Sequence, residues 1–282
     1  MSALKFGVAL GRLNPTFHLE ATLEAERLGF ESVWLPEHLV FPVEMGGSPH
    51  PGESHPPVPP STPVFDCFAY LAFLAARTKR LRLGTHVYNL ALRHPFVAAR
   101  AVQTLDILSE GRAEIGIGAG WLASEWQARG LDFHSRGRRL DEALAVCKHL
   151  WSDEVFEHKG EFYEFGPVMF EPKPLQRPWP PIHVGGESEA ALRRAARYGD
   201  GWIGMGHNPE SVTEPVARLH ALREQAETTD GRFEVSVGGT VEDRAGIAAW
   251  EEAGVDRLIV SPWRRSPEAI EGLRRFADAV FP

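Results

Sequence analysis

The chain has 282 residues, of which 43% are hydrophobic and 24% charged, and these ordinary values exclude a chain that is disordered throughout. Its formal net charge of -8 argues against nucleic acid as the main partner, because phosphate binding needs a basic surface. The sequence has no secretory leader pattern and no apolar run long enough to span a bilayer, so we expect a cytoplasmic protein without a membrane partner.

Apolar runs of strand length alternate along the chain with amphipathic helical stretches. The predicted strands are residues 5–9, 32–35, 81–88, 113–117, 182–184, 201–205, 234–237 and 257–260. The predicted helices are residues 17–28, 66–77, 95–108, 140–151, 187–198, 209–228, 241–253 and 266–280. Strict alternation implies a parallel sheet, and eight repeats favour its closure into a barrel. The sequence therefore predicts an α/β fold, a single-domain (β/α)8 TIM barrel over residues 1–282, with its active site in the loops that follow the strands.

Two stretches interrupt this alternation. Residues 41–64, after the second strand, are polar and rich in proline, and we interpret them as a lid-like insertion over the active site. Residues 155–165, after the fourth helix, predict a short hairpin insertion without a catalytic role. Cys67 and Cys147 each lie inside an apolar helical pattern, which indicates buried thiols and not a disulfide.

The second predicted strand is followed by a carboxylate and an imidazole, Glu37 and His38. Histidine alone changes charge near neutral pH without a large shift, so His38 is a candidate proton donor or acceptor. The alternative is a histidine that only packs against the lid. After the third strand, Arg93 and His94 precede Pro95, a residue suited to a first helical position, and we interpret them as shaping that helix entry.

The fourth strand runs into three small residues, Gly118, Ala119 and Gly120, followed by Trp121. Small residues there allow a planar ligand to approach the backbone closely. The run also fits a dinucleotide fingerprint, but that fold needs an acidic residue at the end of the next strand, whereas residues 140–143 lie inside a predicted helix. We therefore favour the barrel over a Rossmann fold.

The fifth strand ends in Gly185, Gly186, Glu187 and Ser188, directly before a predicted helix. Free N–H groups at a helix N-terminus, together with the hydroxyl of Ser188, can bind a phosphate or a carboxylate, and a simple structural turn explains the pattern equally well. No His-Glu-x-x-His or Cys-x-x-Cys spacing predicts a metal site, and the lack of a Gly-x-Ser-x-Gly elbow or a P-loop removes the simplest hydrolase assignments.

Several segments occur together in an order that is characteristic of one family. They are residues 25–34, 93–95, 104–112, 116–121, 181–188 and 199–202. On these segments the chain resembles the bacterial luciferase-like family, especially its short branch of oxidoreductases that use the deazaflavin coenzyme F420. The resemblance covers nearly the whole chain.

The resemblance implies roles for the candidate residues. Glu37 and His38 fall where the family has an acidic residue and an active-site histidine. A non-proline cis peptide that supports the cofactor ring would join His86 and Val87, residues 118–121 would line the cofactor pocket, and residues 185–188 would bind the cofactor phosphate.

The resemblance also implies hydride transfer between coenzyme F420 and a small organic substrate, with His38 as proton donor or acceptor. An FMN-dependent monooxygenase that uses O2 is the alternative, and a barrel that carries or senses a flavin without turnover is a third. Some F420-dependent members have a catalytic glutamate where this chain has Trp121, so their proton transfer cannot be copied here. FMN-using luciferases place an arginine where this chain has Ala119, which favours F420 over FMN.

Three further expectations concern the surroundings of the site. Trp121, Tyr88 and the lid would form an apolar substrate wall. The arginines at 136, 138 and 139 are the nearest basic cluster for the anionic cofactor tail, although they could also be a solvated face. The family suggests a homodimer.

Overall fold

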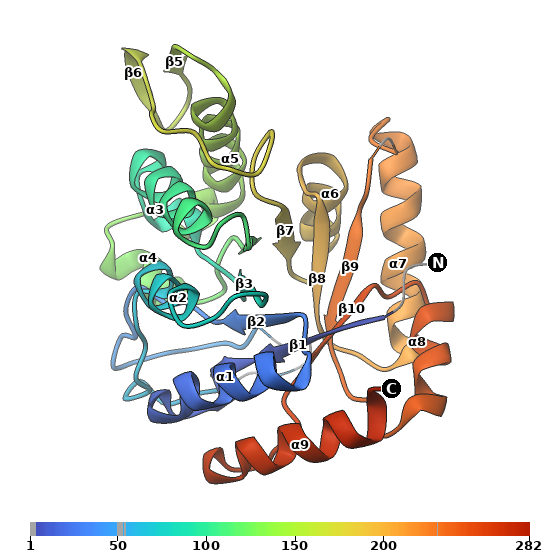
Figure 1. The fold of residues 1–282 in the computed structure, drawn as a ribbon. Coiled ribbons are helices and arrows are strands. Elements are labelled where there is room, and N and C mark those ends of the chain that lie inside the picture. The colour runs from blue at the N-terminus through green and yellow to red at the C-terminus, as the bar shows by residue number, and fades with distance from the viewer. Residues whose placement is uncertain (1–3, 50–52, 54, 230) are drawn as a thin grey trace.

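Eight parallel strands close into a barrel with helices around it (Figure 1), in a computed structural model that describes residues 4–49, 53, 55–229 and 231–282. The strands follow the order β1-β10-β9-β8-β7-β4-β3-β2 around the barrel. Their bounds are β1 Lys5–Ala9, β2 Ser32–Leu35, β3 Arg82–Thr85, β4 Ala113–Ile117, β7 Ile182–Gly185, β8 Gly201–Gly206, β9 Glu234–Gly238 and β10 Arg257–Val260. The predicted TIM barrel is therefore confirmed.

The helices lie outside the strands and bury one face against them. Their bounds are α1 His18–Leu28, α2 Cys67–Ala75, α3 Pro95–Leu108, α4 Ala123–Ala128, α5 Arg136–Ser152, α6 Glu189–Tyr198, α7 Pro209–Gln225, α8 Ile247–Glu252 and α9 Ala269–Val280. Strands β2, β4 and β10 are buried at every position, as expected for strands enclosed between a packed interior and a ring of helices. Cys67 and Cys147 are free and buried, as predicted.

Several predicted boundaries were wrong, including the ends of the helices predicted over residues 209–228 and 266–280, which span Pro209–Gln225 and Ala269–Val280. The strand predicted over residues 81–88 corresponds to β3, which ends at Thr85. Beyond it, Tyr88 forms an isolated β-bridge with Ile117. The helix predicted over residues 140–151 begins earlier, at Arg136, and the helix predicted over residues 241–253 is shorter because a 3-10 turn precedes it. Helix α4 was not predicted, since six residues are too few to show a helical period.

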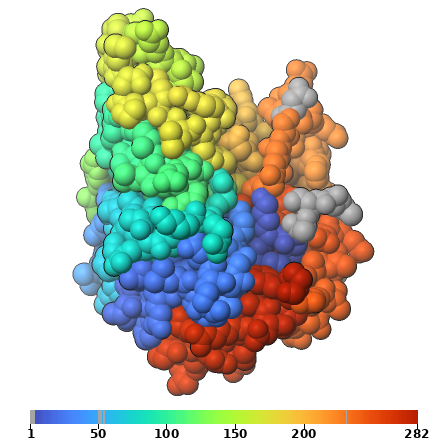
Figure 2. All heavy atoms as spheres, in the orientation of Figure 1, coloured from blue at the N-terminus to red at the C-terminus, as the bar shows by residue number. Residues whose placement is uncertain are grey.

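The two insertions have different characters. Strands β5 Phe156–Lys159 and β6 Glu164–Val168 pair antiparallel after α5, which confirms the predicted hairpin, and they project at the top left of Figures 1 and 2. The described part of the insertion at residues 41–64 contains no helix or strand, and residues 50–52 and 54 of it lie outside the described residues.

The end of the barrel at the amino ends of the strands is closed by buried charges. Arg257, fully buried, donates to both carboxylate oxygens of Glu31 at 3.0 Å and lies 3.1 Å from Glu234. Glu114 pairs with His183 and with Arg82 beside it. The opposite end, at the carboxyl ends of the strands, holds the predicted site. No helix in the described part of the chain is long and apolar enough to cross a membrane.

Candidate active site at the carboxyl ends of the strands

The predicted site residues follow four strands, β2, β3, β4 and β7, which are consecutive neighbours in the barrel. All of these strands are parallel, so their carboxyl ends lie at one rim. The structure therefore places the segments that begin at Glu37, His86, Gly118 and Gly185 on one continuous arc of that rim.

His38 stands at the β2 end of this arc with its side chain 15% exposed. Its ring lies between two aromatic residues, with centroid distances of 4.4 Å to Phe41 and 5.8 Å to Trp121. Its Nδ1 atom is 3.1 Å from Oε2 of Glu125, a buried carboxylate on α4. The Nε2 atom has no hydrogen-bond partner among the described residues and is available for a ligand.

Glu37, the neighbour of His38, is buried and ties two loops together. The Nη2 of Arg93 donates to its Oε1 at 2.6 Å, and the backbone N–H of Asn89 donates to its Oε2 at 3.0 Å. The Arg93 guanidinium also lies 4.6 Å from the ring centre of Tyr88. His94 accepts from the Phe96 amide as the N-cap of α3, as its structural interpretation predicted. Arg93 differs from that interpretation, because its guanidinium joins Glu37 and Tyr88.

The centre of the arc is the cis peptide bond between His86 and Val87, which the family resemblance implies. The backbones at the carboxyl ends of β4 and β7 approach Val87 closely. A Cβ at Gly118 would lie 2.7 Å from Cγ2 of Val87, and one at Gly185 would lie 2.8 Å from its Cγ1. Burial lowers the pKa of His86 to about 4, so its imidazole is neutral at physiological pH.

The substrate wall that we expected is only partly present. Trp121 is half-buried at the rim, beside Phe41 and His38. Tyr88 is 2% exposed and packs edge-on against Phe68, with a distance of 4.8 Å between the ring centres. The expectation for Tyr88 was wrong, because the turn of the chain after Thr85 directs it into the core.

The β7 end of the arc leads into α6. Ser188 is the N-cap of this helix and accepts from the Ala191 amide at 3.2 Å. The amide groups of residues 187–190 have no acceptor within the described residues, as is usual in the first turn of a helix. Glu187 is held by β8, because it accepts from the Met205 amide at 2.6 Å and lies 3.2 Å from His207.

The arginines at 136, 138 and 139 are engaged elsewhere. Arg136 lies 4.0 Å from the ring centre of Phe133, Arg138 pairs with Glu161 on the hairpin, and Arg139 lies 4.3 Å from the ring centre of Phe162. The hairpin thus binds two of the three arginines. They are better described as a structural and solvated face of α5 than as a site for the cofactor tail.

One group of residues has metal-ligand chemistry, namely Glu114, His183 and Glu234, whose ligand atoms lie within 4.8 Å of one another. These carboxylates already pair with Arg257, Arg82 and Lys5, so the cluster is neutralised by protein cations. It also lies at the amino ends of the strands, away from the arc. We interpret it as a structural ion network.

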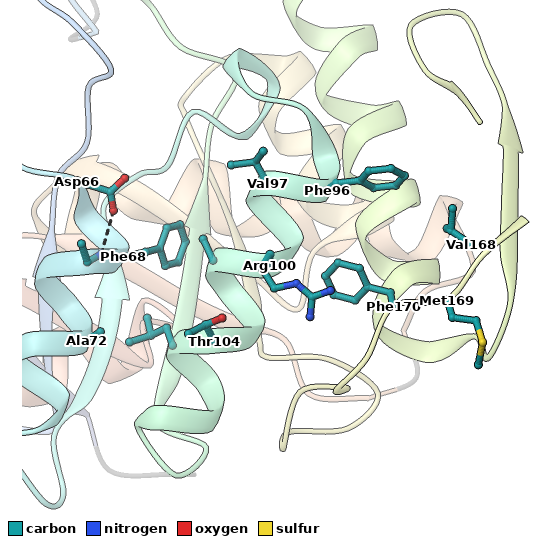
Figure 3. A pocket seen from close by; sticks show the side chains of 13 residues that line it. Asp66, Phe68, Ala72, Phe96, Val97, Arg100, Thr104, Val168, Met169 and Phe170 are labelled. Atoms are coloured by element: carbon teal, nitrogen blue, oxygen red, sulfur yellow. Dashed lines mark hydrogen bonds between the residues drawn. The ribbon is translucent and has the colours of Figure 1, made fainter. Parts of the chain in front are cut away.

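A second hollow lies outside the barrel, between α2, α3 and the segment after β6 (Figure 3). It has a volume of about 710 Å³ and a mostly apolar lining that includes Phe68, Val97 and Met169. Arg100 crosses it with its guanidinium 3.9 Å from the ring centre of Phe170. This groove is separate from the arc of predicted site residues.

Sequence reasoning missed Glu125 and the pairing of Arg93 with Glu37. Glu125 lies four residues after Trp121 on a helix too short to be recognised, and a lone acidic residue is usually solvated. Arg93 precedes Pro95, and the start of the helix there already explained its presence in the sequence. Both contacts span more than 50 residues of sequence, so only the closed barrel brings the partners together.

Comparison with known proteins agrees with this geometry. The family model described as luciferase-like monooxygenase matches residues 5–276. An uncharacterized protein of Mycobacterium tuberculosis is 32% identical over 292 residues, which is 99% of each chain. An F420-dependent glucose-6-phosphate dehydrogenase of Amycolatopsis mediterranei is 29% identical over 95% of this chain and 78% of its own length.

Solved structures show the same fold. An F420-dependent secondary alcohol dehydrogenase, in complex with an F420-acetone adduct, superposes with a TM-score of 0.78 at 17% identity, over 99% of this chain and 98% of that chain. At this identity the likeness concerns the fold alone. The sequence matches carry the assignment further: the chain belongs to the luciferase-like monooxygenase family.

Proposed function

We propose that this protein is an oxidoreductase that uses coenzyme F420 and a small organic substrate at the rim of the barrel. The observation that supports it best is the arc itself, because His38 with a free Nε2, the neutral His86 and the free amides of residues 187–190 all follow strands whose carboxyl ends lie at one rim. Its F420-dependent dehydrogenase relative in Amycolatopsis mediterranei points the same way.

The residues of the arc fit the chemistry of this cofactor. The side chain of Val87 fills the space beside Gly118 and Gly185, so only glycine fits next to the residue that the family resemblance places against the cofactor ring. The free amides of residues 187–190 can bind its phosphate. Two carboxylates lie near these amides, and both have partners. Glu189 pairs with Arg193 and Arg218, and Glu187 accepts from the Met205 amide of β8.

The cofactor, when bound, supplies the exchange of a hydride with the substrate. His38 gives or takes the accompanying proton at Nε2, the ring atom that remains free. Phe41 and Trp121 flank this ring and exclude water from it. Glu37 is buried, and we assign it the role of holding the β2 and β3 loops together through Arg93 and the Asn89 amide.

Fluorescence titration of the purified apo-protein with F420 and with FMN tests the proposal. We expect tight binding of F420 and weaker binding of FMN, because Ala119 stands where the FMN-using luciferases have an arginine. Tight FMN binding together with negligible F420 binding would overturn the choice of cofactor and favour the O2-dependent monooxygenase.

We also propose that the protein is a homodimer whose copies meet at the groove of Figure 3. Val97 and Met169, which line it, are 59% and 62% exposed, and contiguous apolar surface of this kind marks interaction sites. Light scattering should give twice the chain mass for the wild type and a smaller mass for Val97→Asp. Val43→Asp, on an 88% exposed residue of the lid, is the control that keeps the dimer. A monomeric wild type would contradict the proposal.

A further inference from the structure

Glu125 is a fully buried carboxylate whose described contacts include no lysine or arginine. Its Oε1 accepts from the backbone amides of Leu39 and Val40, at 2.6 and 3.2 Å. Its Oε2 lies 3.1 Å from Nδ1 of His38. All three contacts bind the first residues after β2 to α4, across 85 to 87 residues of sequence.

We propose that Glu125 is a positioning residue that keeps the proton of neutral His38 on Nδ1, so that Nε2 presents its lone pair to the substrate. The proposal rests on the function proposed above. A carboxylate can only accept hydrogen bonds, and Oε1 of Glu125 already accepts two, from the amides of Leu39 and Val40. Nδ1 must therefore carry the hydrogen that lies between them, and the second ring nitrogen of a neutral imidazole is then unprotonated.

This arrangement suits the oxidation of a substrate alcohol. The substrate O–H bond would break as an N–H bond forms at Nε2, and the carbon that bears this oxygen would lose a hydride with its electron pair, for which bound F420 would be the acceptor. His38 then carries a positive charge beside the Glu125 carboxylate, which stabilises it. The reverse direction returns the proton from Nε2 by the same contacts.

The test uses the apo-protein, so it does not depend on turnover. Long-range proton–nitrogen NMR spectra of the ¹⁵N-histidine-labelled wild type, assigned with His38→Asn, should show Nδ1 of His38 protonated and Nε2 unprotonated. In Glu125→Gln the amide oxygen can still accept from Leu39 and Val40. Its NH2 group would then face Nδ1, and the proton should move to Nε2.

Steady-state kinetics of the same variant add a second measurement. The kcat of Glu125→Gln should fall by about 10- to 100-fold, the range found for partners that orient a reacting side chain, while its affinity for F420 in the fluorescence titration stays unchanged. Glu125→Asp, which keeps the charge, should recover the Nδ1-protonated form in part.

The outcomes separate the two proposals. A wild-type His38 protonated on Nε2 would overturn the role of Glu125, and so would an unchanged tautomer in a folded Glu125→Gln. Should this variant fail to fold, the wild-type spectrum alone is the test. A wild type that has the expected tautomer but binds no F420 would overturn the proposed function and leave the geometry of Glu125 and His38 supported.

Discussion

His38 is expected to affect turnover far more than cofactor affinity. Its Nε2 is the free atom of a ring that Glu125, Phe41 and Trp121 hold in place. General acid-base catalysis contributes ~10²- to 10⁴-fold in rate, so His38→Asn should lower kcat by that range and leave the F420 dissociation constant unchanged. His149→Asn, at a half-exposed histidine of α5, is the control. Full activity in a folded His38→Asn would remove this residue from the mechanism.

Gly118 is expected to control cofactor binding through its contact with Val87. An alanine Cβ at this position would lie 2.7 Å from Cγ2 of Val87, so Val87 must move. Overpacking of this kind destabilises a fold by roughly 1–3 kcal/mol. Because Val87 would lie against the cofactor ring in the proposed site, its displacement should also weaken F420 binding, by about tenfold. Gly166→Ala on the hairpin, where a Cβ meets nothing within 4 Å, should bind F420 like the wild type. Equal affinity of the two variants would contradict the pose.

At the scale of elements, Glu142 of α5 makes most of the hydrogen bonds that hold the hairpin β5–β6. Glu142 accepts from the backbone amides of Phe162 and Tyr163 at 3.0 and 2.9 Å, and it lies 3.0 Å from Nε2 of His158. Burial raises the pKa of Glu142, but the hydrogen bonds from His158 and these amides lower it overall. The carboxylate is therefore the form that the hairpin stabilises.

Glu142→Ala should release the hairpin without unfolding the barrel. It leaves the amides of Glu161, Phe162 and Tyr163 without their acceptor, and each lost partner costs ~1–3 kcal/mol where it is buried. We expect faster hydrogen exchange confined to residues 156–168. Glu161→Ala removes only the exposed pair with Arg138, for which ~0–1 kcal/mol is typical, and serves as the control on the same hairpin. Exchange rates that are the same in both variants would show that Glu142 is not the anchor.

At the scale of the whole molecule, the ion network inside the barrel makes the free energy of unfolding depend on pH. Burial raises the pKa of Glu114, but His183, Arg257 and Arg82 together hold it well below its ordinary value. Burial likewise raises the pKa of Glu234, but Arg257 and Lys5 lower it overall. A carboxyl group with a lowered pKa in the folded state stabilises the fold above the unfolded pKa of about 4.3, and this contribution is lost as the pH falls toward the folded pKa.

The free energy of unfolding, measured with urea at a series of pH values, should therefore fall steeply below about pH 4, by roughly 1.4 kcal/mol per pH unit for each such carboxylate. Glu114→Gln should be less stable at pH 7 by ~3–5 kcal/mol, because it leaves Arg257 and Arg82 with less compensation. Its stability should also fall less steeply below pH 4. Parallel curves for the variant and the wild type would show that Glu114 does not carry this dependence.

Most of the barrel, and part of the site, could be predicted from the sequence. The strands are short apolar runs and the helices have local periodicity, so residues 95–108 gave the bounds of α3 without tertiary information. The ends of parallel strands share one rim, and this rule alone predicted that Glu37, His38 and Ser188 lie at that rim. Helix α4 and the early end of β3 were not predicted, because neither has a periodic pattern.

By itself the sequence determined the alternation of strands and helices, the hairpin, the burial of both cysteines and which loops could carry chemistry, because each of these depends on neighbours within a few turns. The tertiary structure alone decided the partners of the charged and aromatic groups. Glu125 beside His38, Arg93 beside Glu37, Tyr88 in the core and Arg257 within the barrel all depend on barrel closure. Closure joins residues that lie far apart in the chain, and buried charges must find their partners there, since water no longer solvates them.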